Sequence, residues 1–202
     1  MRTRKVMALI GAAVATAAVF FFAGRLTRGA GGWERQHVNK SGDSKEFCNS
    51  FLGLTVRAPE GHDWELVWEP AQFNLAPVGV NKVLEVNRTT GSGGGTGHVA
   101  RMDVFVEPIG GSGSVPEVLE RLEFRGKRPG FRIVAEEATT IGGRAGAVRV
   151  AEWAVRRRKY RSVNYYAEHR GRLYAFIGVC EARGFDRLRP TFDGIVSAAR
   201  LD

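Results

Sequence analysis

The chain has 202 residues, of which 44% are hydrophobic and 25% are charged, so it can build one globular domain with an extension. The formal net charge is +9. Residues 1–32 hold five basic and no acidic side chains, which leaves 25 basic against 21 acidic residues, a net charge of +4, for the rest. This small excess does not indicate a nucleic-acid-binding protein, and we expect no nucleic acid as a partner.

The N-terminal segment, residues 1–32, predicts a membrane signal-anchor. Three basic residues precede Val6–Gly24, a run of 19 residues without charge. As a helix this run would span ~28 Å, close to the hydrocarbon thickness of a bilayer. Three phenylalanines and no small-residue cleavage pattern end the run, which favours an uncleaved anchor through residues 6–24 over a cleaved signal peptide. A buried helix of a soluble protein is the third alternative.

The basic residues before this span place the following domain outside the cytoplasm. We therefore expect an extracytoplasmic protein anchored on the periplasmic side of a bacterial inner membrane, or a secreted one if the segment is cleaved. Residues 33–46 predict a flexible tether, and residues 47–202 predict a single domain.

Cys48 and Cys180 are the two cysteines of the chain. An even count in an oxidising compartment permits one disulfide. The bridge would close a loop of ~130 residues and stabilise the domain by at most ~5 kcal/mol. Two free thiols are the alternative, because the sequence cannot show that the two Cα atoms approach each other.

Alternation of apolar and polar residues predicts strands through most of the domain. The first five expected strands are Phe51–Ala58, Trp64–Trp68, Asn81–Thr89, His98–Pro108 and Phe131–Glu137. Three more antiparallel strands are expected between Gly142 and Cys180. Their turns are expected at Gly142–Gly143, at the basic run Arg156–Arg161 and at Arg170–Arg172.

Two helices complete the prediction. Ser114 and Glu117 form a capping-box pattern before the apolar face of VPEVLERLEF. A C-terminal amphipathic helix is expected to begin at Pro190 or Thr191. The fold class is therefore α+β, with a mainly antiparallel sheet of about six to seven strands sandwiched between helices (α/β/α).

The sequence carries no recognisable catalytic, cofactor or metal motif. The glycine-rich stretch Thr89–Gly97 lacks the Lys-Ser/Thr pair and the following helix of a phosphate loop. The stretch Gly110–Gly113 precedes a helix, but no acidic ribose partner follows at the expected distance. Four scattered histidines show no zinc spacing, and no serine lies in a nucleophile elbow.

The basic run is the most unusual surface feature of the sequence. Its cationic residues are Arg156, Arg157, Arg158, Lys159 and Arg161. A hairpin tip is expected here, because crowded like charges avoid burial. Such a tip could bind an anionic lipid, an anionic glycan or an acidic protein. The competing interpretation is a solvated turn that protects the sheet from edge pairing.

Aromatic residues crowd the same region, and we expect most of them in the core. Along the last of the three strands, Leu173, Ala175, Ile177 and Val179 face one way, and Tyr174 and Phe176 face the other. Both faces are apolar, which predicts a central strand with a helix on each side.

The order of several motifs resembles the PsbP-like (Mog/PsbP/DcrB-type) family across Phe51 to Leu201. The motifs are FLGLTVRAPEGHDW, MDVFVEP, VPEVLERL, IGGRAGAVRVAEW, GRLYAFIGV and FDGIVSAARL. The sequence departs from the family where His62 and Asp63 separate Gly61 from Trp64, and in the length of the glycine loop. The resemblance implies an antiparallel sheet sandwiched between helices, and a non-catalytic role in binding or assembling other proteins.

Three functions therefore remain open for the domain. The first is a membrane-tethered binding or assembly-accessory domain whose partner is another envelope protein. The second is an envelope enzyme, which a polar pocket formed by Glu152, Glu168 and His169 would favour. The third is a binder of anionic surfaces that acts through the basic hairpin tip at 156–161.

Overall fold

The computed structural model describes residues 45–61, 63–68, 81–89, 98–109, 114–123 and 128–202. The expected membrane span Val6–Gly24, residues 33–44 of the tether and the glycine stretches at 90–97 and 110–113 lie outside these residues. Among the described residues, no helix is both long enough and apolar enough to cross a membrane.

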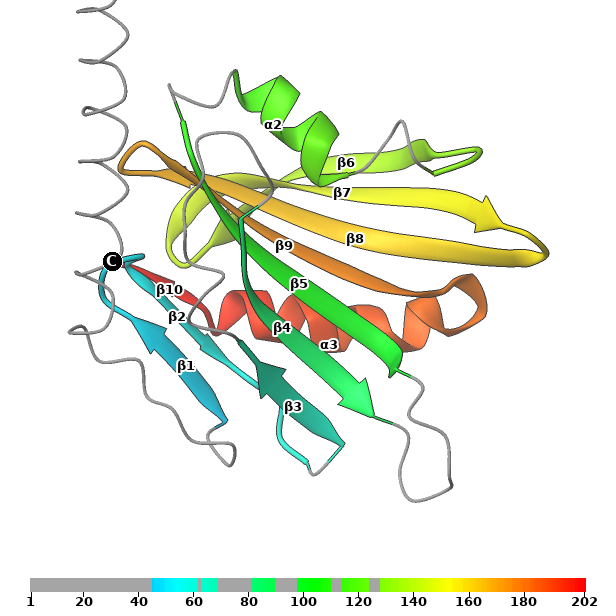
Figure 1. Ribbon diagram of the computed structural model, residues 1–202, viewed down its shortest axis with the longest axis horizontal. Coiled ribbons are helices and arrows are strands. Elements are labelled where there is room, and N and C mark those ends of the chain that lie inside the picture. The colour runs from blue at the N-terminus through cyan, green and yellow to red at the C-terminus, as the bar shows by residue number, and fades with distance from the viewer. Residues whose placement is uncertain (1–44, 62, 69–80, 90–97, 110–113, 124–127) are drawn as a thin grey trace, which may run out of the picture. The chain divides into compact units, whose positions relative to one another are not determined.

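A seven-stranded antiparallel sheet forms the centre of the described domain, with the order β3-β4-β5-β9-β8-β7-β6 (Figure 1). This order confirms the α+β class and the antiparallel sheet. The strands are β3 (Trp64–Val67), β4 (Lys82–Thr89), β5 (His98–Pro108), β6 (Arg132–Ile141), β7 (Arg144–Val155), β8 (Arg158–His169) and β9 (Arg172–Glu181).

A second, three-stranded sheet was not predicted. It consists of β1 (Glu46–Asn49), β2 (Leu54–Arg57) and β10 (Arg200–Leu201). The strand expected at Phe51–Ala58 therefore begins later and belongs to this small sheet. Gly53 has a φ of +59°, and the Leu52 amide donates to the Asn49 side chain at 3.0 Å, so residues 50–53 turn instead of extending.

Helix α2 (Val115–Leu122) packs on one face of the large sheet. The capping box of Ser114 and Glu117 is present, as predicted, and the Ser114 amide donates to the Glu117 carboxylate at 2.7 Å. Its buried residues meet a cluster of sheet side chains, namely Phe105, Tyr166, Leu173, Ala175 and Ile177.

Helix α3 (Phe185–Ser197) covers the opposite face, after a short 3₁₀ turn at Ala182–Gly184. The predicted start at Pro190 or Thr191 is wrong, because Pro190 lies inside the helix. An interior proline costs about 3 kcal/mol. The helix persists because one face buries Phe185, Leu188, Phe192, Ile195 and Val196.

Strand β9 is the central strand that the sequence predicted. It lies between β5 and β8, and both of its faces are buried. Leu173, Ala175 and Ile177 face α2, whereas Gly178 faces the ring of Phe192 on α3. The small sheet joins the α3 side, because the Tyr174 hydroxyl donates to the Leu52 carbonyl at 2.6 Å.

Candidate functional site

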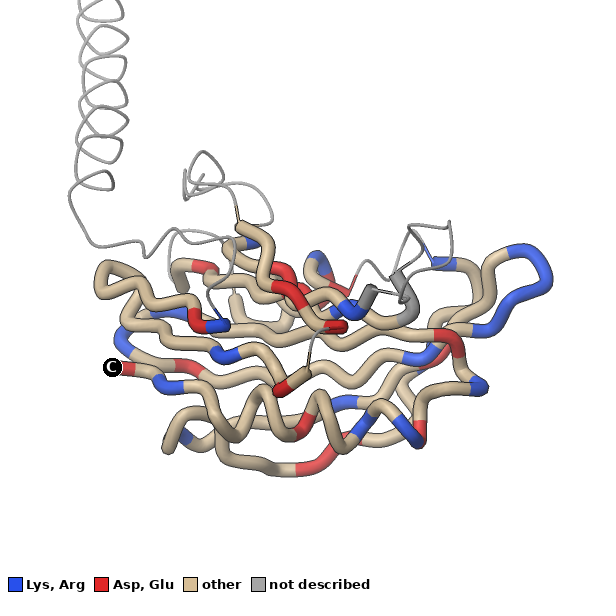
Figure 2. The backbone as a smooth tube through the Cα atoms, turned by 90° about the horizontal axis from the view of Figure 1, so that it is seen from below, with Lys and Arg blue, Asp and Glu red and all other residues tan. Residues whose placement is uncertain are grey.

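The basic run forms the end of the β7–β8 hairpin, where Figure 2 shows a continuous stretch of basic backbone. The predicted turn at Arg156–Arg161 is too long, because only Arg156 and Arg157 separate the two strands. Arg156 has a φ of +55°, a value typical of the tight two-residue turns that join antiparallel strands. The strand pairing extends up to this turn, since Val155 pairs with Arg158 and Trp153 pairs with Tyr160.

Strand alternation divides the remaining basic residues between the two faces of the sheet. Arg158 lies on the α2 side of the sheet, where its Nη1 pairs with Glu181 Oε1 at 3.2 Å. Lys159 and Arg161 lie on the α3 side. Arg161 is not at the tip, since its Nε donates to Glu152 Oε1 at 2.5 Å and its side chain is only 35% exposed.

Three surface hollows of the described residues lie around this end of the sheet, which we call the basic end. Each has a volume of about 460–490 Å³. The first is lined by Arg128, Gly130, Phe131, Arg132 and Ile133. The second is lined by Gly130, Arg132, Glu152, Trp153, Ala154, Lys159, Tyr160, Arg161 and Ala182. The third is lined by Arg157, Arg158, Lys159, Glu181, Ala182 and Arg183.

A stack of aromatic rings supports the basic end from the α2 side. The Trp153 ring lies between Tyr160, at 5.8 Å between centroids, and Phe131, at 6.5 Å. The Arg128 guanidinium lies 4.2 Å from the centre of the Trp153 ring. Trp153 is buried, so this stack packs the β7–β8 hairpin against the side chains of Phe131 and Arg128.

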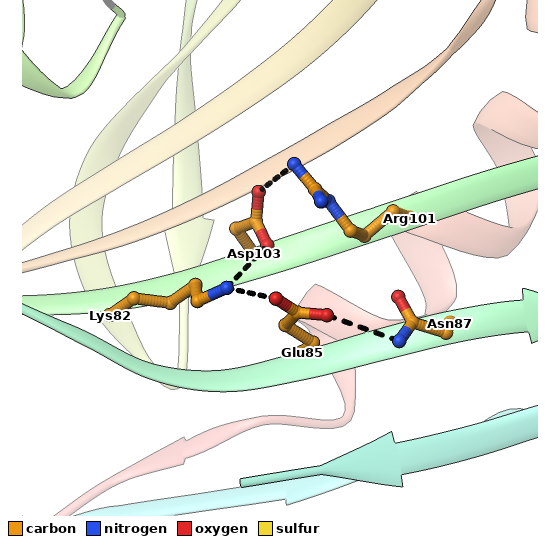
Figure 3. A network of polar contacts seen from close by, with 5 residues as sticks. All are labelled: Lys82, Glu85, Asn87, Arg101 and Asp103. Carbon is orange, nitrogen blue, oxygen red and sulfur yellow. Dashed lines mark hydrogen bonds and ion pairs between the residues drawn. The ribbon is translucent and has the colours of Figure 1, made fainter. Parts of the chain in front are cut away.

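A network of charged side chains lies on the α2 side of β4 and β5 (Figure 3). Arg101 Nη2 pairs with Asp103 Oδ2 at 3.0 Å, and Lys82 Nζ contacts Glu85 and lies 3.9 Å from Asp103 Oδ1. Burial raises the pKa of Asp103, and the two cations offset this effect only in part. Burial also acts on Glu85, but hydrogen bonds from Lys82 and Asn87 outweigh it and lower the pKa of Glu85.

The raised pKa of Asp103 leads to a prediction for Asp103→Asn. The native state binds the Asp103 proton more tightly than the unfolded chain, whose aspartates titrate near pH ~3.9, so wild-type stability falls as the pH rises through the native pKa. The variant lacks this loss. We expect its free energy of unfolding, relative to wild type, to increase between about pH 3.5 and about pH 7 in urea unfolding. A difference that is the same at both pH values would contradict the burial of an ionised carboxylate.

A second cluster of polar side chains connects the end of α2 to the sheet. Glu123 is completely buried, and its Oε1 accepts hydrogen bonds from the Tyr166 hydroxyl at 3.0 Å and from Asn164 Nδ2 at 3.4 Å. Arg149 Nη1 lies 3.7 Å from the same oxygen and also pairs with Glu136. This network connects the end of α2 to β7 and β8.

The residues named for an envelope enzyme do not converge. Glu152 faces the α3 side and pairs with Arg161 near the start of β8. Glu168 and His169 lie at the opposite end of β8, opposite Leu173 and Arg172 of β9. Positions 161 and 168 are seven residues apart, a distance of ~23 Å along the strand. Within the described ranges, no three His, Cys, Asp or Glu side chains gather as metal ligands.

The disulfide between Cys48 and Cys180 is not formed in the structure. Cys48 is exposed on β1 of the small sheet, and its sulfur accepts a hydrogen bond from Thr55 Oγ1 at 3.5 Å. Cys180 is buried at the end of β9 in the large sheet, and burial raises the pKa of its thiol to about 11. The two strands belong to different sheets, so the two side chains do not face each other across a strand pair.

Two solved structures share the arrangement of strands and helices described above. The solution structure of the cyanobacterial PsbP protein CyanoP from Synechocystis sp. PCC 6803 is 12% identical, covers 82% of this chain and 96% of its own, and gives a TM-score of 0.56. The domain has the PsbP-like fold. The resemblance expected from the order of motifs is thereby confirmed at the level of the fold.

The second structure with this PsbP-like arrangement is LpqN, involved in cell envelope biogenesis of Mycobacterium tuberculosis. It is 15% identical, covers 73% of this chain and 83% of its own, and gives a TM-score of 0.51. No family profile matches the sequence, and no curated protein matches it either.

Sequence reasoning found the cations of the hairpin but missed the residues that organise them. Arg132, Glu152, Glu181 and Arg183 come from β6, β7, β9 and the following turn. The sequence signal for these four residues was weak. Charged residues on the outer positions of expected strands are common, and only the pairing of those strands shows which charges meet.

Proposed function

We propose that this chain is a membrane-tethered, extracytoplasmic and non-catalytic binding domain of the cell envelope, whose basic end docks on an acidic surface of another envelope protein. The three hollows described above support this proposal. They lie at the basic end, and arginine side chains line each of them. Arg156, Arg157 and Lys159 are exposed and form no ion pair with a described residue, so their charge is available to a partner.

The shared fold supports a binding role without naming a partner. A PsbP-like fold does not by itself determine the function of a domain, because the function depends on the residues of the site. LpqN is involved in cell envelope biogenesis, which agrees with an envelope location for this chain. The sequence features of residues 1–32 supply the expected anchor.

The proposal predicts that the chain no longer binds its partner when the positive charges of the β7–β8 turn are removed. In-cell crosslinking and pull-down of the full chain should recover one stoichiometric envelope protein. Arg156→Gln with Arg157→Gln should reduce this recovery at least about tenfold, because rim charges steer association and hold an acidic surface. Raising the salt concentration should weaken the wild-type complex in vitro.

The matched control is Arg144→Gln with Arg170→Gln, which removes the same charge from exposed positions at the opposite ends of β7 and β8. This control should recover the partner as wild type does. Equal loss in both double variants would mean that net charge alone is responsible, and unchanged recovery with the turn variant would overturn the proposed docking surface.

A further inference from the structure

Strand β6 forms an open edge of the seven-stranded sheet. Among the described strands only β7 pairs with it, and Figure 1 shows it as the outermost strand on this side of the sheet. Residues 132–138 are all exposed, although their side chains point to both faces of the sheet. The strand therefore presents a row of backbone N–H and C=O groups that can pair with a further strand.

The side chains of β6 leave this edge accessible. Its sequence, RIVAEEATTI, contains neither lysine nor proline, two residues that commonly protect an edge strand from pairing. Ile133 is 37% exposed and Val134 is 43% exposed, although both are large apolar residues. Two adjacent exposed apolar side chains on an open edge favour contact with another strand, which would cover them.

A β-bulge near the middle of this edge restricts which strand can pair with it. Val134 is the extra residue of the bulge, because Ile133 and Ala135 lie opposite neighbouring residues of β7. A regular strand would lose register here. A second copy of β6, antiparallel and related by a two-fold axis at Ala135, carries the same bulge on the other side of the axis. Both strands then keep the same number of paired residues, so the edge fits a copy of itself better than a regular strand.

The charges of β6 fit the same register. With the axis at Ala135, Arg132 of each copy lies opposite Glu137 of the other copy. Both side chains lie on the α3 side of the sheet, because Arg132 lies opposite Glu152 and Glu137 lies opposite Val148 on β7. The symmetry gives two such pairs of opposite charge and places no like charges opposite each other.

We infer that the domain forms a symmetric dimer in which two β6 strands pair and join the two large sheets into one continuous antiparallel sheet. The interface is isologous, with Ala135 on the axis and the exposed apolar residues Ile133 and Val134 of both copies beside it. This inference does not rest on the proposed partner, because it uses none of the cations of the β7–β8 turn.

Oxidative crosslinking of the full chain in intact cells tests the dimer. The background is Cys48→Ala, which removes the exposed native thiol. Ala135→Cys should then give a disulfide-linked dimer as the main species in non-reducing electrophoresis, because directly opposite residues of antiparallel strands lie within reach of a disulfide. Absence of this dimer would overturn the inference.

Thr140→Cys is the matched control for the crosslink, on the same strand and also exposed. Thr140 lies five residues beyond Ala135, so its two copies would be ~34 Å apart in the dimer. This variant should remain monomeric. Equal crosslinking at both positions would mean random collision and would also overturn the inference.

A charge reversal tests the register. Glu137→Arg, added to the Ala135→Cys chain, should lower the yield of crosslinked dimer at least about fivefold, because it places like charges opposite Arg132 twice. Glu168→Arg makes the same charge change at an exposed position at the far end of β8 and should keep the yield within about twofold. An unchanged yield with Glu137→Arg would overturn the proposed pairing.

The dimer and the proposed function fail in different experiments. Loss of the envelope partner with an intact Ala135→Cys crosslink would contradict only the proposed function. Loss of the crosslink with normal recovery of the partner would contradict only the dimer.

Discussion

Phe192→Ala should lower the free energy of unfolding by about 3–5 kcal/mol. Phe192 is completely buried on α3, and a Cβ atom placed on Gly178 would lie 2.8 Å from its ring. The ring therefore fills the space that the glycine of the central strand leaves open. Removing it leaves a cavity between α3 and β9, and the cost of this cavity adds to the lost burial of the ring. Equilibrium urea unfolding measures the loss.

Phe51→Ala is the matched control for this substitution. Phe51 is 39% exposed and lies against the Arg172 side chain on the surface. Its truncation removes less buried area, so we expect a loss of at most about 1 kcal/mol. The packing argument also predicts that Gly178→Ala destabilises the domain, since the added methyl would overlap the Phe192 ring. If Phe192→Ala changed stability no more than Phe51→Ala, α3 would not be packed on β9 as described.

Glu123→Ala should lower the free energy of unfolding by about 3 kcal/mol. The substitution removes the acceptor of the Tyr166 hydroxyl and of Asn164, and both of these polar groups are buried. It also removes a buried negative charge beside Arg149, whose side chain is only 18% exposed. The expected loss of stability lies at the lower end of the range for breaking a buried ion pair, because Arg149 keeps Glu136 as a partner.

Two further variants separate the hydrogen bonds of Glu123 from its charge. Glu123→Gln keeps the oxygen acceptor and should cost about 1 kcal/mol, less than Glu123→Ala. The Glu136 side chain is 49% exposed and is the outer partner of Arg149, so Glu136→Gln should change stability by less than about 1 kcal/mol. If Glu123→Ala cost no more than Glu136→Gln, the network would not hold α2 on the sheet.

Local rules predicted the elements whose signals lie within a few residues. The capping box of Ser114 and Glu117 begins α2 as expected, and Gly142 and Gly143 form the turn between β6 and β7 with φ values of +54° and +77°. A left-handed turn of this kind favours glycine, so the two adjacent glycines predict it from the sequence. The alternating faces of β9 also followed from period-2 patterning.

The errors arose where distant contacts outweighed local preference. Proline predicts a helix start, but the packing of five apolar side chains on the sheet carries α3 through Pro190. The strand expected at Phe51–Ala58 became part of a small sheet because β10, from the C-terminus, pairs with β2. Nothing near residue 54 specifies a partner at residue 201.

The candidate site shows the same division. The sequence by itself determined that a dense run of cations would lie exposed at the end of a hairpin, because such charges cannot be buried together. Only the tertiary structure decided which carboxylates organise them. Glu152 and Glu181 are far from their arginine partners in sequence, and strand pairing brings them within hydrogen-bond distance of Arg132, Arg158 and Arg161. Register is a property of the whole sheet, so the arginine-lined hollows of the basic end exist only once the sheet has formed.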